Sequence, residues 1–164
     1  MEKRELKLET VRKQAEIRLA GGRILSGDFF VSAVSPSGPG SERVLDLLNG
    51  EKRFLPFMLE GGEVVLIRRR AILTVVPEKD DTLAAESLYR KISASIQLDT
   101  GDTIHGHVFT DLPESHSRLS DFFNHCGEFF FFRAGRRAHL VNSCRILSIR
   151  QRERAEEKGA FQKV

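Results

Sequence analysis

The chain has no tryptophan, one tyrosine and two cysteines among its 164 residues. Both cysteines, Cys126 and Cys144, lie in the second half, so we expect no disulfide framework. No apolar run approaches the roughly 20 residues that a membrane-spanning helix requires. The first residues lack the apolar stretch and the small-residue cleavage site of a secretory signal. We therefore expect a cytoplasmic protein that makes no membrane contact.

The motifs that identify common catalytic and metal sites are also missing. The sequence has no nucleophile elbow, no phosphate loop of the G-x-x-x-x-G-K type, and neither His-Glu-x-x-His nor Cys-x-x-Cys. His105 and His107 lie two apart on a predicted strand, but Ser26 and Asp28 occupy the matching positions in the first half. We predict a protein that is not an enzyme and that holds no cofactor and no metal ion.

The net charge is also small. The chain has 26 basic and 23 acidic residues, a formal net charge of +3, and acidic residues are interspersed with basic ones. This balance permits nucleic-acid binding without requiring it.

What the sequence does contain is an internal repeat. Residues 15–75 and 94–149 carry the same motifs in the same order, and a repeat of this kind changes the unit that folds. The matched identities are Leu19 and Leu98, Gly22 and Gly101, Gly27 and Gly106, Phe30 and Phe109, Arg43 and Arg118, Asp46 and Asp121, Asn49 and Asn124, Phe54 and Phe129, Phe57 and Phe132, Leu66 and Leu140, Ile72 and Ile146, and Leu73 and Leu147.

Each copy shows the pattern of short, half-buried strands. Apolar residues alternate with polar ones over 15–19 and again over 92–98, which is typical of a strand with one face in a core. A glycine turn follows, and then a second strand with a glycine, Gly27 or Gly106, in its interior. Such a glycine marks a bend or a close backbone approach. Short strands at 54–59, 64–68 and 71–76, with counterparts in the second copy, complete five strands per copy.

The predicted division of the chain follows from this repeat. We expect a charged N-terminal arm over 1–13, a first unit over 14–77 and a helical linker over 78–91. A second unit follows over 92–149, and a charged tail over 150–164. Within each unit, 43–49 and 118–124 have helical apolar spacing and predict a short inserted helix.

The motif Leu19-x-x-Gly22-x-x-Leu25-x-Gly27 resembles the first signature of Sm-like proteins, which are small RNA-associated β-barrels. Val65-x-Ile67-Arg68 and the strand 71–77 are similar to the second signature and the closing strand, especially in the bacterial RNA-chaperone branch. Leu98, Gly101, Ile104, Gly106, Leu140, Ile146 and Ile149 match in the second copy. The resemblance covers most of both copies, although SH3-like barrels share such a pattern.

This resemblance implies a mainly β protein of two tandem, strongly bent small barrels, each with a short inserted helix, joined by a linker helix. Sm-like proteins close rings by pairing barrel edges, so a tandem would act as a pre-fused dimer that forms homo-oligomers through its edges. The chain departs from the family at the RNA site. Asp46 and Asn49 lie beyond a long insertion, and Arg69 replaces the usual glycine.

Two sets of polar residues are candidates for binding. The basic turns could contact RNA phosphates, which supply affinity but little sequence information. A second set, spaced three apart on the predicted helices, forms a polar ridge that either binds a partner or holds the helix on the barrel. The basic turns are Arg68, Arg69 and Arg70 with Arg133, Arg136 and Arg137; the ridges are Arg43, Asp46 and Asn49 with Arg118, Asp121 and Asn124.

The leading functional hypothesis is therefore a non-catalytic module that binds RNA through its basic turns. The alternative is a protein-interaction or assembly module that does not bind nucleic acid. The basic turns favour RNA, whereas the altered base-binding motif and the mixed charges favour a protein partner.

Overall fold

The computed structural model describes residues 9–36, 38–78, 88–111, 113 and 118–152, and these residues form a mainly β fold with two short α-helices. The first five strands are β1 (Thr10–Leu19), β2 (Ile24–Ser32), β3 (Phe54–Leu59), β4 (Val64–Arg68) and β5 (Ile72–Pro77). The other five are β6 (Arg90–Leu98), β7 (Thr103–Thr110), β8 (Phe129–Ala134), β9 (Arg137–Asn142) and β10 (Ile146–Gln151).

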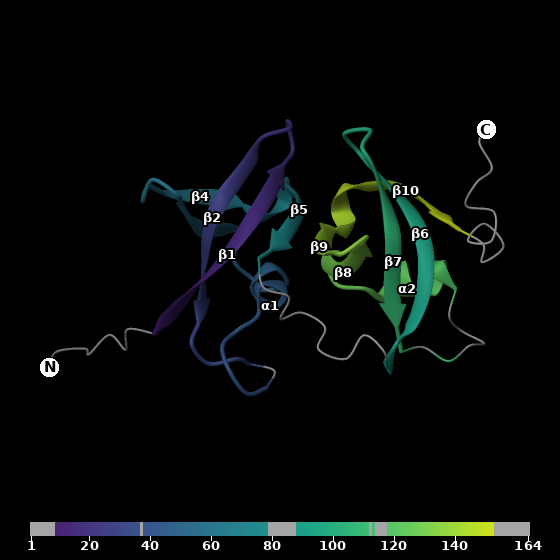
Figure 1. Ribbon diagram of the computed structural model, residues 1–164, viewed down its shortest axis with the longest axis horizontal. Coiled ribbons are helices and arrows are strands. Elements are labelled where there is room, and N and C mark those ends of the chain that lie inside the picture. The colour runs from purple at the N-terminus through teal and green to yellow at the C-terminus, as the bar shows by residue number, and fades with distance from the viewer. Residues whose placement is uncertain (1–8, 37, 79–87, 112, 114–117, 153–164) are drawn as a thin grey trace, which may run out of the picture.

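All strand pairs are antiparallel and belong to one ten-stranded sheet, in the order β10-β6-β7-β8-β9-β5-β1-β2-β3-β4. The first five strands run β5-β1-β2-β3-β4 and the last five run β10-β6-β7-β8-β9, so the two halves share one strand order (Figure 1). The expected pair of strongly bent barrels is not confirmed, because β5 and β9 pair and join all ten strands in one sheet. β4 and β10 are the outer strands.

The alternation read in the sequence places one face of each first strand in a core. Ala15 and Ile17 of β1 are buried, as are Ile92, Ala94, Ile96 and Leu98 of β6. The following turns contain glycines with positive φ, 90° at Gly22 and 95° at Gly101, a backbone region that glycine enters without steric cost.

Gly27 and Gly106 bring neighbouring strands unusually close. A Cβ atom on Gly27 would collide with the carbonyl oxygen of Met58, and one on Gly106 would collide with that of Arg133. The predicted close approach is therefore real at both positions, and both β2 and β7 need glycine there.

The two helices lie where the sequence predicts them. α1 spans Val44–Leu48, with Arg43 as its N-cap and Asn49 as its C-cap, and α2 spans Leu119–His125, with Arg118 as its N-cap. Each follows the second strand of its half and precedes the third. Single-turn 3₁₀ helices, η1 (Arg69–Ala71) and η4 (Ser143–Arg145), connect β4 to β5 and β9 to β10.

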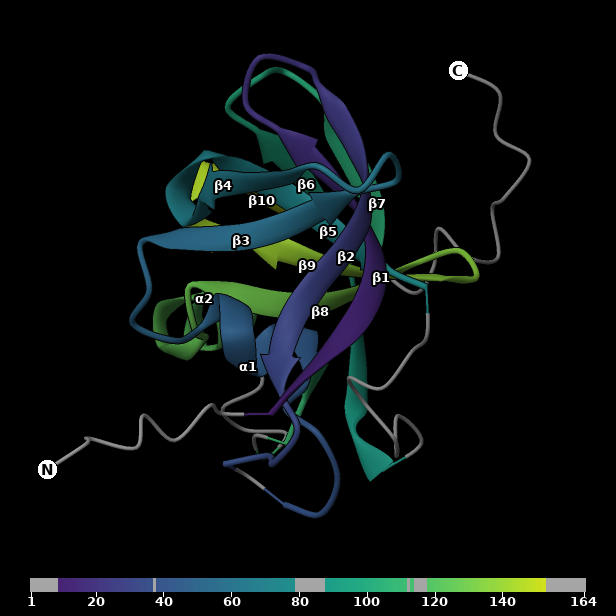
Figure 2. The same ribbon diagram turned by 90° about the vertical axis from the view of Figure 1, so that its left-hand side faces the viewer.

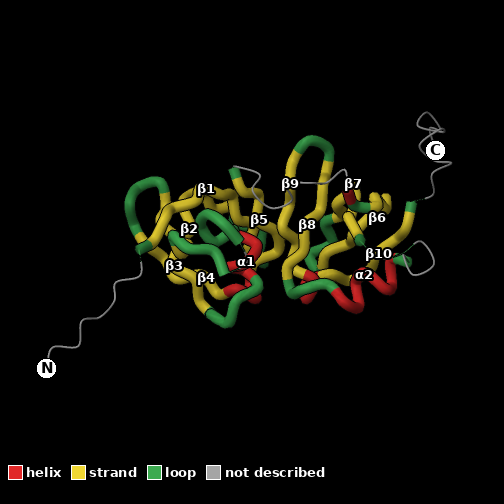
Figure 3. Tube along the Cα trace, turned by 90° about the horizontal axis from the view of Figure 1, so that it is seen from below, coloured by secondary structure: helices red, strands yellow, loops and turns green. Residues whose placement is uncertain are grey.

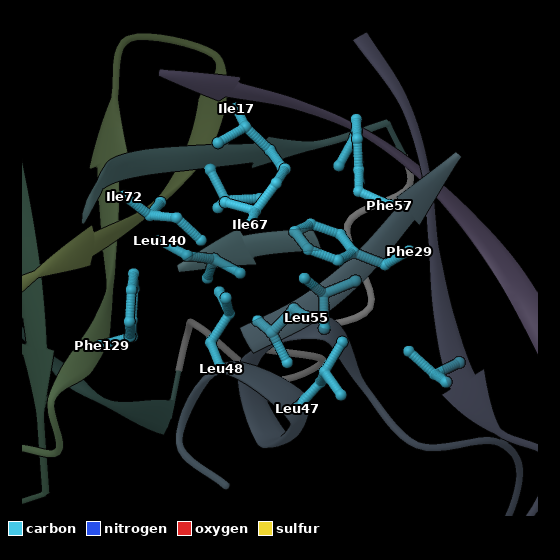
Figure 4. Close-up of a cluster of buried hydrophobic side chains, with 14 of the residues drawn as sticks. Ile17, Phe29, Leu47, Leu48, Leu55, Phe57, Ile67, Ile72, Phe129 and Leu140 are labelled. Carbon is cyan, nitrogen blue, oxygen red and sulfur yellow. The ribbon is translucent and has the colours of Figure 1, made fainter. Parts of the chain in front are cut away.

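The hydrophobic core crosses the boundary between the halves. Phe129 and Leu140 of the second half belong to the cluster built on β1–β5, where they lie near Ile72 and Leu48 (Figure 4). In return, Leu73 of β5 packs into the cluster of the second half. β5 therefore serves both cores, and the two halves fold against each other.

Several predicted boundaries shift. β1 begins at Thr10, inside the expected arm, and β6 begins at Arg90, inside the expected linker, because cross-strand pairing extends both strands beyond their alternating core segments. β10 continues to Gln151. The expected helix over 78–91 lies mostly outside the described residues, as do most of the arm and the tail. Among the described helices, none has the length and apolar character to cross a membrane.

Candidate functional site

The junction between the halves brings together some of the sequence-predicted site residues, among them Asn49 and Arg69. It is centred on the ladder in which Thr74 lies opposite Val141 and Val75 opposite Leu140. β5 and β9 lie near the middle of the molecule (Figure 3), and β4 and β10 are the two outermost strands in the sheet order. Both strands are buried along the ladder, so the junction is part of the core rather than a loose domain contact.

Asn49 ties α1 to the second half. Its side-chain Nδ2 donates a hydrogen bond to the carbonyl oxygen of Phe129 at 3.0 Å, and the Phe129 N–H donates to Asn49 Oδ1 at 2.8 Å. The fully buried Asn142, which lies opposite Phe129 in the β8–β9 pair, donates to the carbonyl oxygen of Ile72 at 3.0 Å. Both asparagines satisfy backbone groups across the junction, which would be costly to leave unpaired in a core.

Arg69 is the residue of the first basic turn that makes contacts at the junction. Its guanidinium lies 3.1 Å from the carboxylate of Glu128 in the other half, and it donates to the carbonyl oxygen of Gly50. Only 12% of the Arg69 side chain and 21% of the Glu128 side chain are exposed, so solvent screens this ion pair weakly. Arg68 and Arg70 are exposed on either side of it. The three arginines therefore do not form one surface for phosphate.

Arg133, Arg136 and Arg137 lie on the β8–β9 hairpin, beside a groove of about 360 Å³ between the halves. Arg133 lies over the Phe131 ring, 5.1 Å from its centroid. The facing wall is acidic and comes from β1 and the end of β5, with Glu16 and Glu78. The groove therefore combines positive and negative walls, which is a poor match for a polyanion.

The two predicted polar ridges differ. Arg43 and Asp46 form a two-point ion pair, with Arg43 Nε and Nη2 each 3.0 Å from the Asp46 carboxylate, and the Arg43 N–H also donates to that carboxylate at 3.3 Å. This pair closes the first turn of α1, which is the structural role considered above. In the second half, Arg118 and Asn124 are exposed, and no described ion pair joins Arg118 to Asp121.

The open edges carry apolar residues that are exposed. On and beside β4, Leu66 is 69% exposed, Phe54 52% and Val64 51%; on β10, Leu147 is 67% exposed. Figure 2 shows β3 and β4 at the near end of the molecule. Next to β4, a cleft of about 210 Å³ is lined mainly by apolar residues, among them Leu19, Leu25 and Val65.

Two titratable groups outside these surfaces, Cys126 and His139, have shifted pKa values. Burial raises the pKa of the Cys126 thiol above its usual range, which disfavours the reactive thiolate. Burial, together with Arg137 and Arg18, lowers the pKa of His139 on β9, whereas Glu16 opposes the shift. No group of three or more His, Cys, Asp or Glu suited to a metal ion occurs within the described residues.

The junction and the residues that form its polar contacts were not predicted from the sequence. Glu128 and Asn142 had no visible role, because their counterparts in the first copy are Arg53 and Arg68. This difference between the copies is the feature of the sequence that marks the junction, because a junction that occurs once in the chain needs its polar residues in one copy only. Comparison with protein-family models, with curated proteins and with solved structures gives no match for this chain.

Proposed function

We propose that the chain is a non-catalytic interaction module that binds a protein partner along the open edges of its sheet. The observation that carries this proposal is the exposure of Leu66 on β4 and Leu147 on β10, at 69% and 67%. Large apolar side chains on unpaired outer strands favour pairing with another chain.

The junction supports this proposal because it shows the corresponding positions of the repeat in a buried environment. Leu140 corresponds to Leu66 in the repeat and is fully buried, and Leu73 corresponds to Leu147 and is 1% exposed. A strand laid against either edge would bury a leucine that is now mostly in water, which contributes about 1 kcal/mol each. Backbone hydrogen bonds would add direction, as in other cases of strand addition.

The finer architecture is part of the proposal. We infer that each half is a copy of one strongly bent, barrel-like unit of five strands, with α1 or α2 inserted between its second and third strands. The shared strand order and the paired close approaches at Gly27 and Gly106 support this inference. A unit of about 60–70 residues is near the lower limit for independent folding, so each copy is stabilised by its neighbour.

Photocrosslinking tests the proposed surface. A benzophenone amino acid is placed at position 66 or 147, and at Ile24 as a control, because Ile24 is 53% exposed but lies on β2 inside the sheet. We expect protein crosslinks from positions 66 and 147 in cells and none from 24. Equal crosslinking at all three positions, or none at the two edges, would overturn the proposed function.

RNA binding is a second candidate, favoured by one observation: Arg136 and Arg137 are exposed at the tip of the β8–β9 hairpin. Fluorescence anisotropy with short U-rich and A-rich RNAs across a salt series tests it. Phosphate contact requires a log–log salt slope of about −0.7 per neutralised phosphate. Replacing Arg136 and Arg137 with Ala is compared with Arg68→Ala/Arg70→Ala, because Arg69 holds the junction. Flat anisotropy at low salt removes this candidate.

A further inference from the structure

We infer that the groove between the halves binds a small zwitterion, a molecule of amino-acid or short-peptide size that carries one ammonium and one carboxylate group. The site is centred on β5 and β9 rather than on the outer strands, so the inference goes beyond the proposed function. Three features of the groove support it: two strands that separate, walls of opposite charge, and a volume that suits a small ligand.

The groove opens where β5 and β9 separate. Their ladder ends at Val75 and Leu140, although β5 continues to Pro77. The next residues, Val76 and Pro77 of β5 and Ala138 of β9, line the groove and do not pair with each other. Because proline has no N–H group, this end of β5 cannot continue a full ladder. The sequence thus contributes to the separation of the two strands at this point.

Both strands are held in place by pairing on their other sides. Pro77 of β5 lies opposite Ala15 of β1, and Ala138 of β9 lies opposite Arg133 of β8. The buried residues of the lining are Ala15, Pro77 and Ala138. The groove is therefore formed by fixed backbone and small side chains, and a preorganised site of this kind loses little entropy when a ligand binds.

The walls of the groove carry three charged side chains each, of opposite sign. They are Glu16, Glu60 and Glu78 from the first half, and Arg133, Arg136 and Arg137 from the β8–β9 hairpin. Within the part of the chain that the structure describes, no ion pair joins Arg136 or Arg137 to a glutamate of the facing wall. The two walls therefore present both charges to a common space.

This arrangement favours a ligand that carries both charges. Guanidinium groups bind a carboxylate through paired hydrogen bonds, and the glutamates of the other wall attract an ammonium group. A ligand with a single charge gains from one wall only, and a polyanion is repelled by the glutamates. The volume of about 360 Å³ lies at the lower end of the range for small-ligand sites, about 300–1,000 Å³. Amino acids and short peptides with free ends fit both requirements.

Glycine, diglycine and triglycine are matched probes, because their charged ends are the same and only the distance between these ends differs. For each length, the N-acetylated form keeps only the carboxylate and the C-terminal amide keeps only the ammonium. We expect one length to bind best, and both single-charge forms of that length to bind about fivefold more weakly. NMR titrations that follow the backbone amides of Val76 and Ala138 measure binding in the groove.

Two pairs of substitutions test the walls separately. Arg136→Ala with Arg137→Ala weakens the basic wall, and Glu16→Gln with Glu78→Gln weakens the acidic wall. Each pair should lower the affinity for the best zwitterion about fivefold. The arginine variant should then bind the zwitterion no more tightly than its amide, and the glutamate variant no more tightly than its acetylated form. None of these side chains is buried, so we expect both variants to fold, which thermal melts verify.

Arg68→Ala combined with Arg70→Ala is the control, because both arginines are exposed and neither lines the groove. This variant should bind the zwitterion as the unchanged chain does. The inference is wrong if the zwitterion and its single-charge forms bind equally well. It is also wrong if millimolar peptide leaves the amides of Val76 and Ala138 unshifted.

Discussion

The internal junction and the open edges present the same sequence positions in two environments. Leu140 and Leu73 are 0% and 1% exposed, whereas their counterparts Leu66 and Leu147 are 69% and 67% exposed. The difference does not come from the strands, which keep the same neighbours within each half. It comes from whether a second five-stranded unit lies alongside. In the proposed function, a partner strand would cover the outer edges as the neighbouring half covers β5 and β9 at the junction.

The largest expected difference concerns the buried and exposed leucines themselves. We expect Leu140→Ala to lower the free energy of unfolding by about 3 kcal/mol, because the buried side chain leaves a cavity in the core. Leu66→Ala should change it by less than about 0.5 kcal/mol. Urea unfolding followed by circular dichroism in dilute protein measures both. Similar losses for the two variants would show that β4 is covered within the single molecule.

A second comparison uses two asparagines that match in the repeat, the C-cap Asn49 of α1 and Asn124 within the last turn of α2. Asn49→Ala removes two hydrogen bonds to the backbone of Phe129, which is only 1% exposed. This change should lower the free energy of unfolding by about 2 kcal/mol. Asn124→Ala should leave the stability of the dilute protein unchanged, because Asn124 is exposed. Urea unfolding of both variants measures the difference. A loss of stability in Asn124→Ala would contradict the assigned difference.

The ion pairs across the junction give a smaller effect. A double-mutant cycle on Arg69 and Glu128 should return a coupling of about 1–2 kcal/mol, since both side chains are largely buried. The control is Arg18 and Asp102, which are 3.8 Å apart with 44% and 58% of their side chains exposed. That pair should couple by no more than a few tenths of a kcal/mol. Equal coupling in both cycles would remove the distinction between buried and exposed contacts.

Replacing His139 should have the smallest effect on stability, and this effect depends on pH. Its pKa in the folded protein is below the ordinary value of 6.5, so the unfolded chain binds the proton more readily in the interval between the two values. Stability contributed by the neutral ring is present above pH 6.5 and is lost as pH falls through that interval. In His139→Gln, the urea midpoint should fall less on acidification from pH 7.5 to 5. Parallel curves for the two proteins would contradict this.

The elements of the fold were largely predictable because their causes are local. Alternation at 15–19 and 92–98 depends only on which side chains face a core, and Gly27 and Gly106 mark close approaches by lacking a side chain. The continuous sheet was not predictable in this way. Pairing of β5 with β9 depends on contacts between residues some 65 positions apart, and neither strand differs locally from its unpaired counterpart.

The candidate site was only partly predictable for the same reason. Arg68, Arg69 and Arg70 look alike in sequence, and only the position of Glu128 in the folded chain separates Arg69 from its neighbours. Asn49 and Asn124 match in the repeat, yet only Asn49 has a second unit beside it. Sequence identity between the copies identified positions that matter for the junction, but it could not show which copy's residue is buried against the other half.

Hydrogen exchange measured in dilute protein tests the central claim most directly. Amides of β5 and β9 lie in the core ladder and should be protected. Amides on the open sides of β4 and β10 should exchange quickly in dilute protein. Protection of β4 and β10 equal to that of β5 and β9 in dilute protein would contradict the claim that the outer edges are open to a partner.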